Sequence, residues 1–167
     1  VYKRQVMVNN AVAVDEQNHL FFTAGYSPGI SALTSFLYMY QPTSGTLQRI
    51  VPPSQVSIGF GAAMVADQHG HLYITQGFMS PGNPRTQAGT GWYLYDIASG
   101  QWHVLAPLPV GLGYSVLALD NASGILLLGG SMDAGQSLPT RQIYHYDIAR
   151  NAWTTEQPMS PAQISGA

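Results

Sequence analysis

The sequence predicts an all-β fold, a partial β-propeller made of three consecutive four-stranded antiparallel blades. Two observations lead to this prediction. Four landmark residues recur three times in the same order, with a period of roughly 50 residues, as in arrays of stacked repeats. No long stretch shows the periodicity of an amphipathic helix. Repeats of this length that contain only strands are typical of propeller blades, each of which packs against its neighbours.

The landmarks give every repeat the same internal order. An aspartate in a turn is followed by a glycine that ends an apolar run, then by a tyrosine in an aromatic strand, and then by one more large side chain. The three sets are Asp15, Gly25, Tyr40 and Leu47; Asp67, Gly77, Tyr95 and Trp102; and Asp120, Gly130, Tyr146 and Trp153. Because the spacing is nearly constant, we expect equivalent residues to occupy equivalent places in successive blades.

The first two strands of each repeat are apolar. Small residues in the first strand suit the crowded innermost position of a blade. The second strand is apolar almost throughout, which is typical of a strand buried on both faces. The expected ranges are 10–14, 61–66 and 114–119 for the first strand and 20–23, 72–75 and 125–128 for the second.

The third and fourth strands form a hairpin in each repeat. The third strand is aromatic and alternating, as a half-buried strand should be. Gly or Asn ends the turn that follows, which suits a left-handed backbone position. The third strand is expected at 36–40, 92–96 and 143–147, and the fourth starts at Leu47, Trp102 or Trp153. Proline-rich segments then connect one repeat to the next, since proline favours edges and connections.

Composition narrows the possible functions. Charged residues make up 8% of the chain and the net charge is −2, so nothing attracts the phosphates of a nucleic acid. There is no cysteine, which excludes disulfides and thiolate sites within this stretch. No apolar run is long enough to predict a membrane span. A surface made polar by uncharged residues favours an extracellular or cell-surface location.

Both ends of the sequence suggest that the chain is an internal fragment. Residues 1–5 look like the translation of a sequencing-library adapter, and we set them aside as a scar. The last residues fall where another strand would begin, so the remaining blades of the same propeller are expected partners. The expected division is 1–5 for the scar, 6–53, 54–109 and 110–161 for three blades, and 162–167 for the start of a further blade.

The repeats resemble the kelch family. Kelch repeats carry two glycines after the second strand, then a tyrosine and a tryptophan, and the third repeat has all of these. The second repeat departs at the first glycine and the first repeat is degenerate. The matching residues, to which the resemblance gives structural roles, are Gly25, Gly77, Gly129, Gly130, Tyr40, Tyr95, Tyr146, Trp102 and Trp153. The resemblance implies a propeller but no particular reaction.

No catalytic residue, metal site or cofactor is predicted. His19 and His71 occupy equivalent places after an aspartate turn, which favours turn chemistry over metal binding. His103 and His145 are expected to cap half-exposed strands. Some kelch-like enzymes are galactose-oxidase-like proteins with copper and a Tyr-Cys crosslink, which a chain without cysteine cannot form within this stretch.

The loops between the second and third strands are long and variable, and such loops on a rigid scaffold often carry binding residues. The candidates are Tyr26, Asn83, Arg85, Gln87, Asp133, Gln136 and Arg141. We therefore expect a propeller segment that binds a protein or glycan through its loop face. The alternative is part of a secreted carbohydrate-active or galactose-oxidase-like enzyme whose catalytic residues lie mostly outside this stretch.

Overall fold

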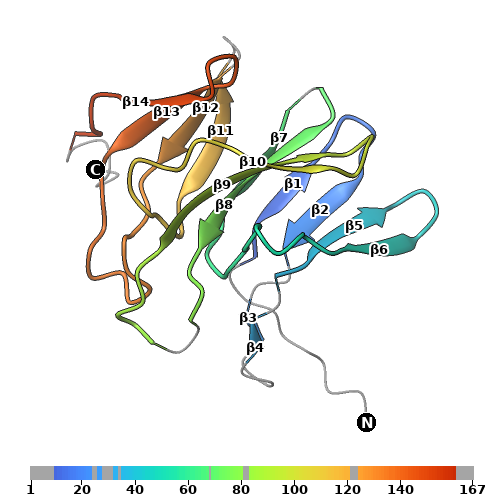
Figure 1. The fold of residues 1–167 in the computed structure, drawn as a ribbon, viewed down its shortest axis with the longest axis horizontal. Helices are drawn as coiled ribbons and strands as arrows, with labels where there is room; N and C mark the ends of the chain where they lie inside the picture. The colour runs from blue at the N-terminus through green and yellow to red at the C-terminus, as the bar shows by residue number, and fades with distance from the viewer. Residues whose placement is uncertain are drawn as a thin grey trace.

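The computed structural model confirms the all-β prediction (Figure 1). It describes residues 10–23, 26–27, 32–33, 35–67, 69–80, 83–120 and 124–160, with the backbone alone at 26–27 and 32–33. Three four-stranded antiparallel sheets follow one another along the chain, and none of the described residues is helical. These sheets are the three predicted blades.

Each blade uses its four strands in chain order from one edge to the other. Blade 1 contains β1 (Val12–Val14), β2 (Leu20–Thr23), β5 (Leu37–Gln41) and β6 (Thr46–Ile50). Blade 2 contains β7 (Met64–Ala66), β8 (His71–Gly77), β9 (Gly89–Asp96) and β10 (Trp102–Val104). Blade 3 contains β11 (Val116–Asp120), β12 (Gly124–Leu128), β13 (Ile143–Asp147) and β14 (Ala152–Thr155). Strand β7 contacts both β1 and β11, so the first strands of the blades lie side by side.

Three details differ from the sequence-based expectation. The first strand of each blade is shorter than expected, because the residues before it belong to the connecting segment. Strands β8 and β9 are longer than expected and continue past a bulge between Thr75 and Gly77. The first variable loop contains a small hairpin, β3 (Tyr26–Ser27) and β4 (Ala32–Leu33), which the sequence analysis treated as loop.

Aspartate turns explain how the first two strands are joined. The Asp15 carboxylate accepts hydrogen bonds from the backbone N–H of Gln17 and His19, and it lies 2.8 Å from His19 Nδ1. Asp67 and His71 repeat this arrangement in blade 2, also with a 2.8 Å contact to Nδ1. The structure thus bears out the turn role expected for these two histidines.

In blade 3, the histidine beside the turn aspartate comes from a different strand. Gly124 stands where the other blades have histidine, and His145 reaches in from β13, with its Nε2 3.3 Å from Asp120 Oδ2. A Cβ added at Gly124 would collide with His145 Nε2. Blade 3 therefore also has an imidazole beside its turn aspartate, but the histidine that supplies it comes from the third strand instead of the second.

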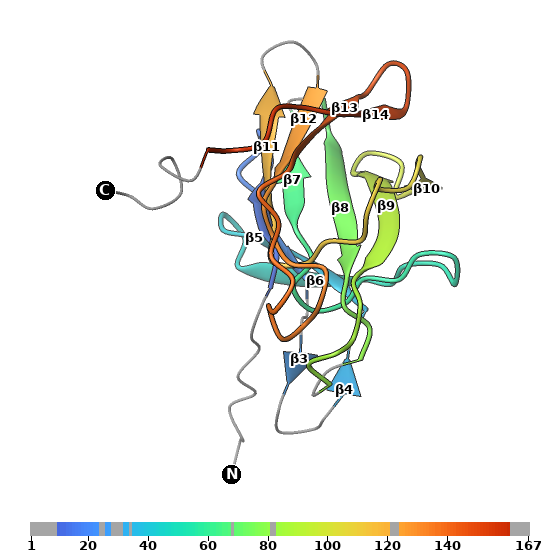
Figure 2. The same cartoon turned by 90° about the vertical axis from the view of Figure 1, so that its left-hand side faces the viewer.

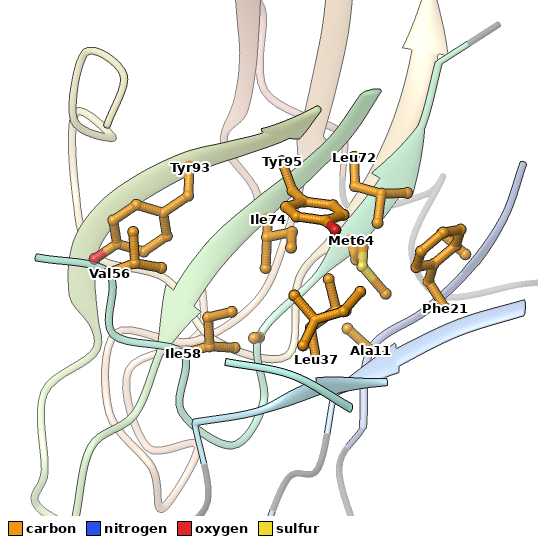
Figure 3. Packing of buried hydrophobic residues seen from close by; sticks show 13 residues of the cluster. Ala11, Phe21, Leu37, Val56, Ile58, Met64, Leu72, Ile74, Tyr93 and Tyr95 are labelled. Carbon is orange, nitrogen blue, oxygen red and sulfur yellow. The ribbon is translucent and has the colours of Figure 1, made fainter. Parts of the chain in front are cut away.

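Two apolar layers hold the blades together. In the first layer, Ala11, Phe21 and Leu37 of blade 1 face Leu72 and Ile74 of blade 2 (Figure 3), and all five are buried. The second layer lies between blades 2 and 3 and is richer in aromatic rings. Its buried members are Tyr73, Trp92, Leu108, Leu112, Ile125, Leu127 and Tyr146. Burial of such side chains stabilises each by about 1.5–3 kcal/mol, so blade packing is the main source of stability.

Glycines after the second strand allow close approach between blade and connection. Gly77 has φ +70°, and a Cβ there would lie 2.6 Å from the Phe60 carbonyl oxygen. Gly129 and Gly130 also have positive φ values. Gly25 lies outside the described residues.

Candidate binding site on the loop face

The loops that follow β2, β8 and β12 emerge on one side of the three blades, which we call the loop face. In Figure 2 the hairpin β3–β4 and the loops after β8 and β12 reach the lower part of the molecule. The segments that connect the blades enter on the same side, because Phe60 forms a bridge with Phe78 and Gly113 with Ser131. The loop face is thus anchored directly to the sheets.

The loops of blades 2 and 3 are joined through their backbones. Ala88 N–H donates to Met132 O, and Ala134 N–H donates to Thr86 O, each at 2.9 Å. Gly135 N–H donates to Pro84 O at 2.8 Å. We call the paired segments 83–88 and 131–138 the joined loops. Their mutual hydrogen bonds give this part of the loop face a defined shape.

Asp133 is a buried residue of the joined loops that accepts several hydrogen bonds from its own loop. It is 4% exposed, and its carboxylate accepts hydrogen bonds from the hydroxyls of Ser131 and Ser137 and from the backbone N–H of Ser137 and Leu138. Desolvation raises the pKa of this carboxyl, but the hydrogen bonds from Ser137, Leu138 and Ser131 outweigh it and lower the pKa to about 2. Asp133 therefore remains ionised at neutral pH and supports the loop.

This carboxylate should make the joined loops sensitive to acid. A folded-state pKa of about 2, against about 3.9 in an unfolded chain, means that its contribution is complete above about pH 4 and is lost as the pH falls toward 2. We expect Asp133→Asn to flatten the fall of the melting temperature across that window. The control is Glu156→Gln, which changes an exposed carboxyl outside the joined loops. Identical pH profiles for wild type and Asp133→Asn would contradict this role.

The candidate binding residues divide into exposed and buried groups. Asn83, Arg85, Gln87, Gln136 and Arg141 are exposed, whereas Asp133 is buried. The side chain of Tyr26 lies outside the described part. The backbone bridge between Gln87 and Asp133 brings the four exposed candidates Asn83, Arg85, Gln87 and Gln136 together on the joined loops. Among the described residues, none of these four forms a hydrogen bond with Arg141, which lies just before β13.

Charge on the loop face differs from that of the whole chain. Arg85 and Arg141 are exposed and make no side-chain hydrogen bond or ion pair with the described residues. Arg49 instead lies 4.7 Å from the Phe36 ring centroid, and Arg150 bonds Asp147 Oδ2 at 2.7 Å. The only acid of the described loops after β8 and β12 is the buried Asp133. The described loops after β8 and β12 of this acidic chain therefore present positive charge.

Sequence reasoning missed Tyr114. This residue has φ +57° and occupies the place that Gly61, with φ +66°, takes in blade 2. Aligning the starts of the expected first strands, 61–66 and 114–119, would have shown a tyrosine opposite a glycine, which is the signal for an unusual backbone. Ser131 and Ser137 were also missed, because their role depends on the loop conformation.

Comparison with known proteins identifies relatives of the propeller. The N-acetylneuraminate epimerase of Haemophilus influenzae (strain PittEE) is 27% identical over 108 residues, which are 58% of this chain and 28% of the epimerase. Human Kelch-like protein 38 is 36% identical over 73 residues, 43% of this chain and 12% of that protein. The solved structure of YjhT superposes with a TM-score of 0.72 at 14% identity, over 92% of this chain and 52% of YjhT. No protein-family model matches the sequence.

The fold and the repeats together define a partial β-propeller of three blades. Its relatives are kelch-repeat propellers, as the spacing of the glycine, tyrosine and tryptophan positions indicated. The chain spans about half the length of YjhT and less of the two sequence relatives. Within the described residues, no helix could cross a membrane.

Proposed function

We propose that the loop face of this propeller segment binds a sugar that carries a carboxylate. The observation that supports the proposal is the pair of exposed arginines, Arg85 and Arg141, that have no side-chain partner among the described residues. Arginine binds carboxylates through paired, charge-assisted hydrogen bonds. One relative is named for N-acetylneuraminate, which is a carboxylated sugar.

The joined loops suit this function because their shape is fixed before a ligand arrives. Their backbones bond to each other, and Asp133 holds the loop that carries Gln136. Binding then orders fewer groups, which favours affinity. The exposed amides of Asn83, Gln87 and Gln136 can donate and accept hydrogen bonds with sugar hydroxyls.

Calorimetric titration with N-acetylneuraminate tests the proposal. We expect Arg85→Gln and Arg141→Gln each to weaken binding by about tenfold, since a hydrogen bond to a charged group contributes roughly 1.5 kcal/mol. Arg150→Gln is the matched control, because Arg150 is paired with Asp147 on a hairpin turn. A neutral sugar, N-acetylglucosamine, should bind more weakly. Equal binding of the two sugars, or no binding of either, would overturn the proposal.

A protein ligand is the second candidate function. Met79 and Leu138, on the loops after β8 and β12, are 36% and 45% exposed, and exposed apolar side chains are common in protein interfaces. A peptide of alternating leucine and glutamate is a suitable probe for the same titration. Binding tighter than that of the sugar, and weakened by Leu138→Ser, would favour this second function.

We also predict that further blades of the same propeller pack against this segment. Val12 and Val14 are 55% and 54% exposed on the outward side of blade 1, and Val116 is 62% exposed on blade 3. Covering such side chains with a neighbouring blade would remove apolar surface from water. If the whole protein is an enzyme, its catalytic residues would be spread over those blades, and this segment would supply part of the binding surface.

A further inference from the structure

Tyr114 has a backbone conformation that is unusual for a large side chain. Its φ of +57° lies in the left-handed region, where the other described non-glycine residues are Asn18, Gln136 and Asn151. Asparagine tolerates this region, but for a bulky residue it is a genuine outlier. Blade 2 places Gly61 at the equivalent position, with φ +66°. A strain-free solution therefore exists in the same molecule, and blade 3 does not use it.

The contacts of Tyr114 hold its ring at the inner end of the loop face. Its N–H donates to the Gly61 carbonyl oxygen at 2.8 Å. Its ring centroid lies 5.0 Å from that of Phe78 and 6.4 Å from that of Phe60. Both phenylalanines are buried, whereas Tyr114 remains half-buried. One side of the tyrosine ring is therefore supported by aromatic packing and part of the residue reaches solvent.

The hydroxyl of Tyr114 connects this position to the joined loops. It donates a hydrogen bond to the Ala134 carbonyl oxygen at 3.3 Å, directly beside Asp133. Burial, together with the nearby Asp133 charge, raises the pKa of Tyr114, so the hydroxyl keeps its proton at neutral pH. The oxygen retains lone pairs that can accept a hydrogen bond from a ligand.

The next position along the chain carries polar atoms whose partners are missing from the described residues. Ser115 Oγ in blade 3 and Asn10 Oδ1 in blade 1 are covered from solvent and make no hydrogen bond with the described part of the chain. Ala62 takes the equivalent place in blade 2. Buried polar atoms without protein partners point to a bound water or ligand nearby. Within the described part of the chain, two of the three blades thus have a covered polar atom without a partner, one position after the place that Tyr114 occupies in blade 3.

We propose that Tyr114 is a ligand-contacting residue at the inner end of the loop face. Its half-buried side chain packs against the apolar face of a sugar, and its hydroxyl oxygen accepts a hydrogen bond from a sugar hydroxyl. Backbone strain of this kind is kept where the side chain is needed, as at ligand-binding positions. Tyrosine offers both an apolar face and a polar tip. The inference rests on the proposed sugar-binding function.

Two variants separate ligand contact from a purely structural role. Tyr114→Phe keeps the ring and removes only the hydroxyl, and Tyr114→Leu removes the aromatic face. With N-acetylneuraminate as the probe, we expect affinity to fall about three- to tenfold for the first variant and further for the second. Tyr40→Phe is the control, because Tyr40 lies near the hairpin turn of blade 1 rather than next to a loop-face connection.

Saturation-transfer NMR supplies a direct readout. Irradiating the aromatic protons should transfer magnetisation to ring protons of the sugar in wild type and in Tyr114→Phe, and much less in Tyr114→Leu. If wild type binds the sugar and both variants bind equally well, the role of Tyr114 is overturned while the proposed function stands. Weaker binding with unchanged transfer in Tyr114→Leu would make Tyr114 a structural support, which also overturns the inference. Absence of binding by the wild type would overturn the proposed function, and the inference with it.

Discussion

Trp153→Ala is expected to lower the free energy of unfolding by about 3 kcal/mol, the lower end of the range for truncating a large aromatic residue. Trp153 is half-buried against two rings of the layer between blades 2 and 3, with centroid distances of 5.3 Å to Trp92 and 5.0 Å to Tyr146. Its Nε1–H also donates to the Ala106 carbonyl oxygen at 3.1 Å. Truncation removes both the packing and a hydrogen bond between blades.

The control for this prediction is Leu47→Ala at the equivalent position of blade 1. Leu47 is 56% exposed, so its truncation should change stability by no more than about 0.5 kcal/mol. Urea unfolding of both variants gives the comparison. Equal losses, or a larger loss for Leu47→Ala, would mean that Trp153 does not anchor blade 3 to blade 2.

Asn151→Gly is expected to cost about 1–2 kcal/mol, because it removes two hydrogen bonds, one of them between blades, while keeping a residue that tolerates positive φ. Asn151 has φ +49°. Its Oδ1 accepts hydrogen bonds from the Ala106 N–H at 2.8 Å and from the Tyr146 hydroxyl at 2.7 Å. Because Tyr146 is 1% exposed, its hydroxyl would be left without this partner.

Among the described residues, the interface between blades 1 and 2 has no hydrogen bonds equivalent to those that Asn151 and Trp153 make with Ala106. Gly100, with φ +70°, stands at the position of Asn151, and a Cβ there would lie 3.9 Å from the Tyr95 hydroxyl. Trp102 Nε1, the counterpart of Trp153 Nε1, is buried without a hydrogen bond to the described residues. Gly100→Asn should therefore raise stability, by up to about 1 kcal/mol.

Gly45 provides the matched control for Gly100→Asn. It occupies the same turn position in blade 1 with φ +68°, and no atom of the described residues lies within 4 Å of a Cβ placed there. Because no described group of another blade lies beside this position, Gly45→Asn should not raise the melting temperature as Gly100→Asn does. A similar gain from both substitutions would show that the effect arises in the turn alone.

Much of the fold could be predicted from the sequence because the repeats have both a regular order and a regular spacing. The strand ranges followed from apolar runs, and the roles of His19 and His71 followed from their equivalent places after Asp15 and Asp67. His145 was harder to interpret, because it fills the place of an absent histidine from a different strand. When a residue of another strand takes over a structural role, the repeat spacing in the sequence does not show it.

The candidate site was only partly predictable. Variable loops marked the correct regions for exposed residues such as Arg85, but loop sequences do not show which backbones pair with each other. The pairing of Thr86 with Ala134 and the burial of Asp133 depend on long-range contacts. Tyr114 was expected to begin the first strand of its blade, whereas the structure starts that strand at Val116 and gives Tyr114 a positive φ, which the apolar pattern does not show.

Hydrogen exchange read by mass spectrometry, with and without N-acetylneuraminate, tests most directly whether the loop face is the binding surface. The account predicts slower amide exchange in residues 83–88 and 131–138, where the joined loops are linked through their backbones. Exchange at the aspartate turns, residues 15–19 and 69–71, should stay unchanged because they lie at the opposite ends of the strands. Protection confined to those turns, or no protection anywhere, would contradict the account.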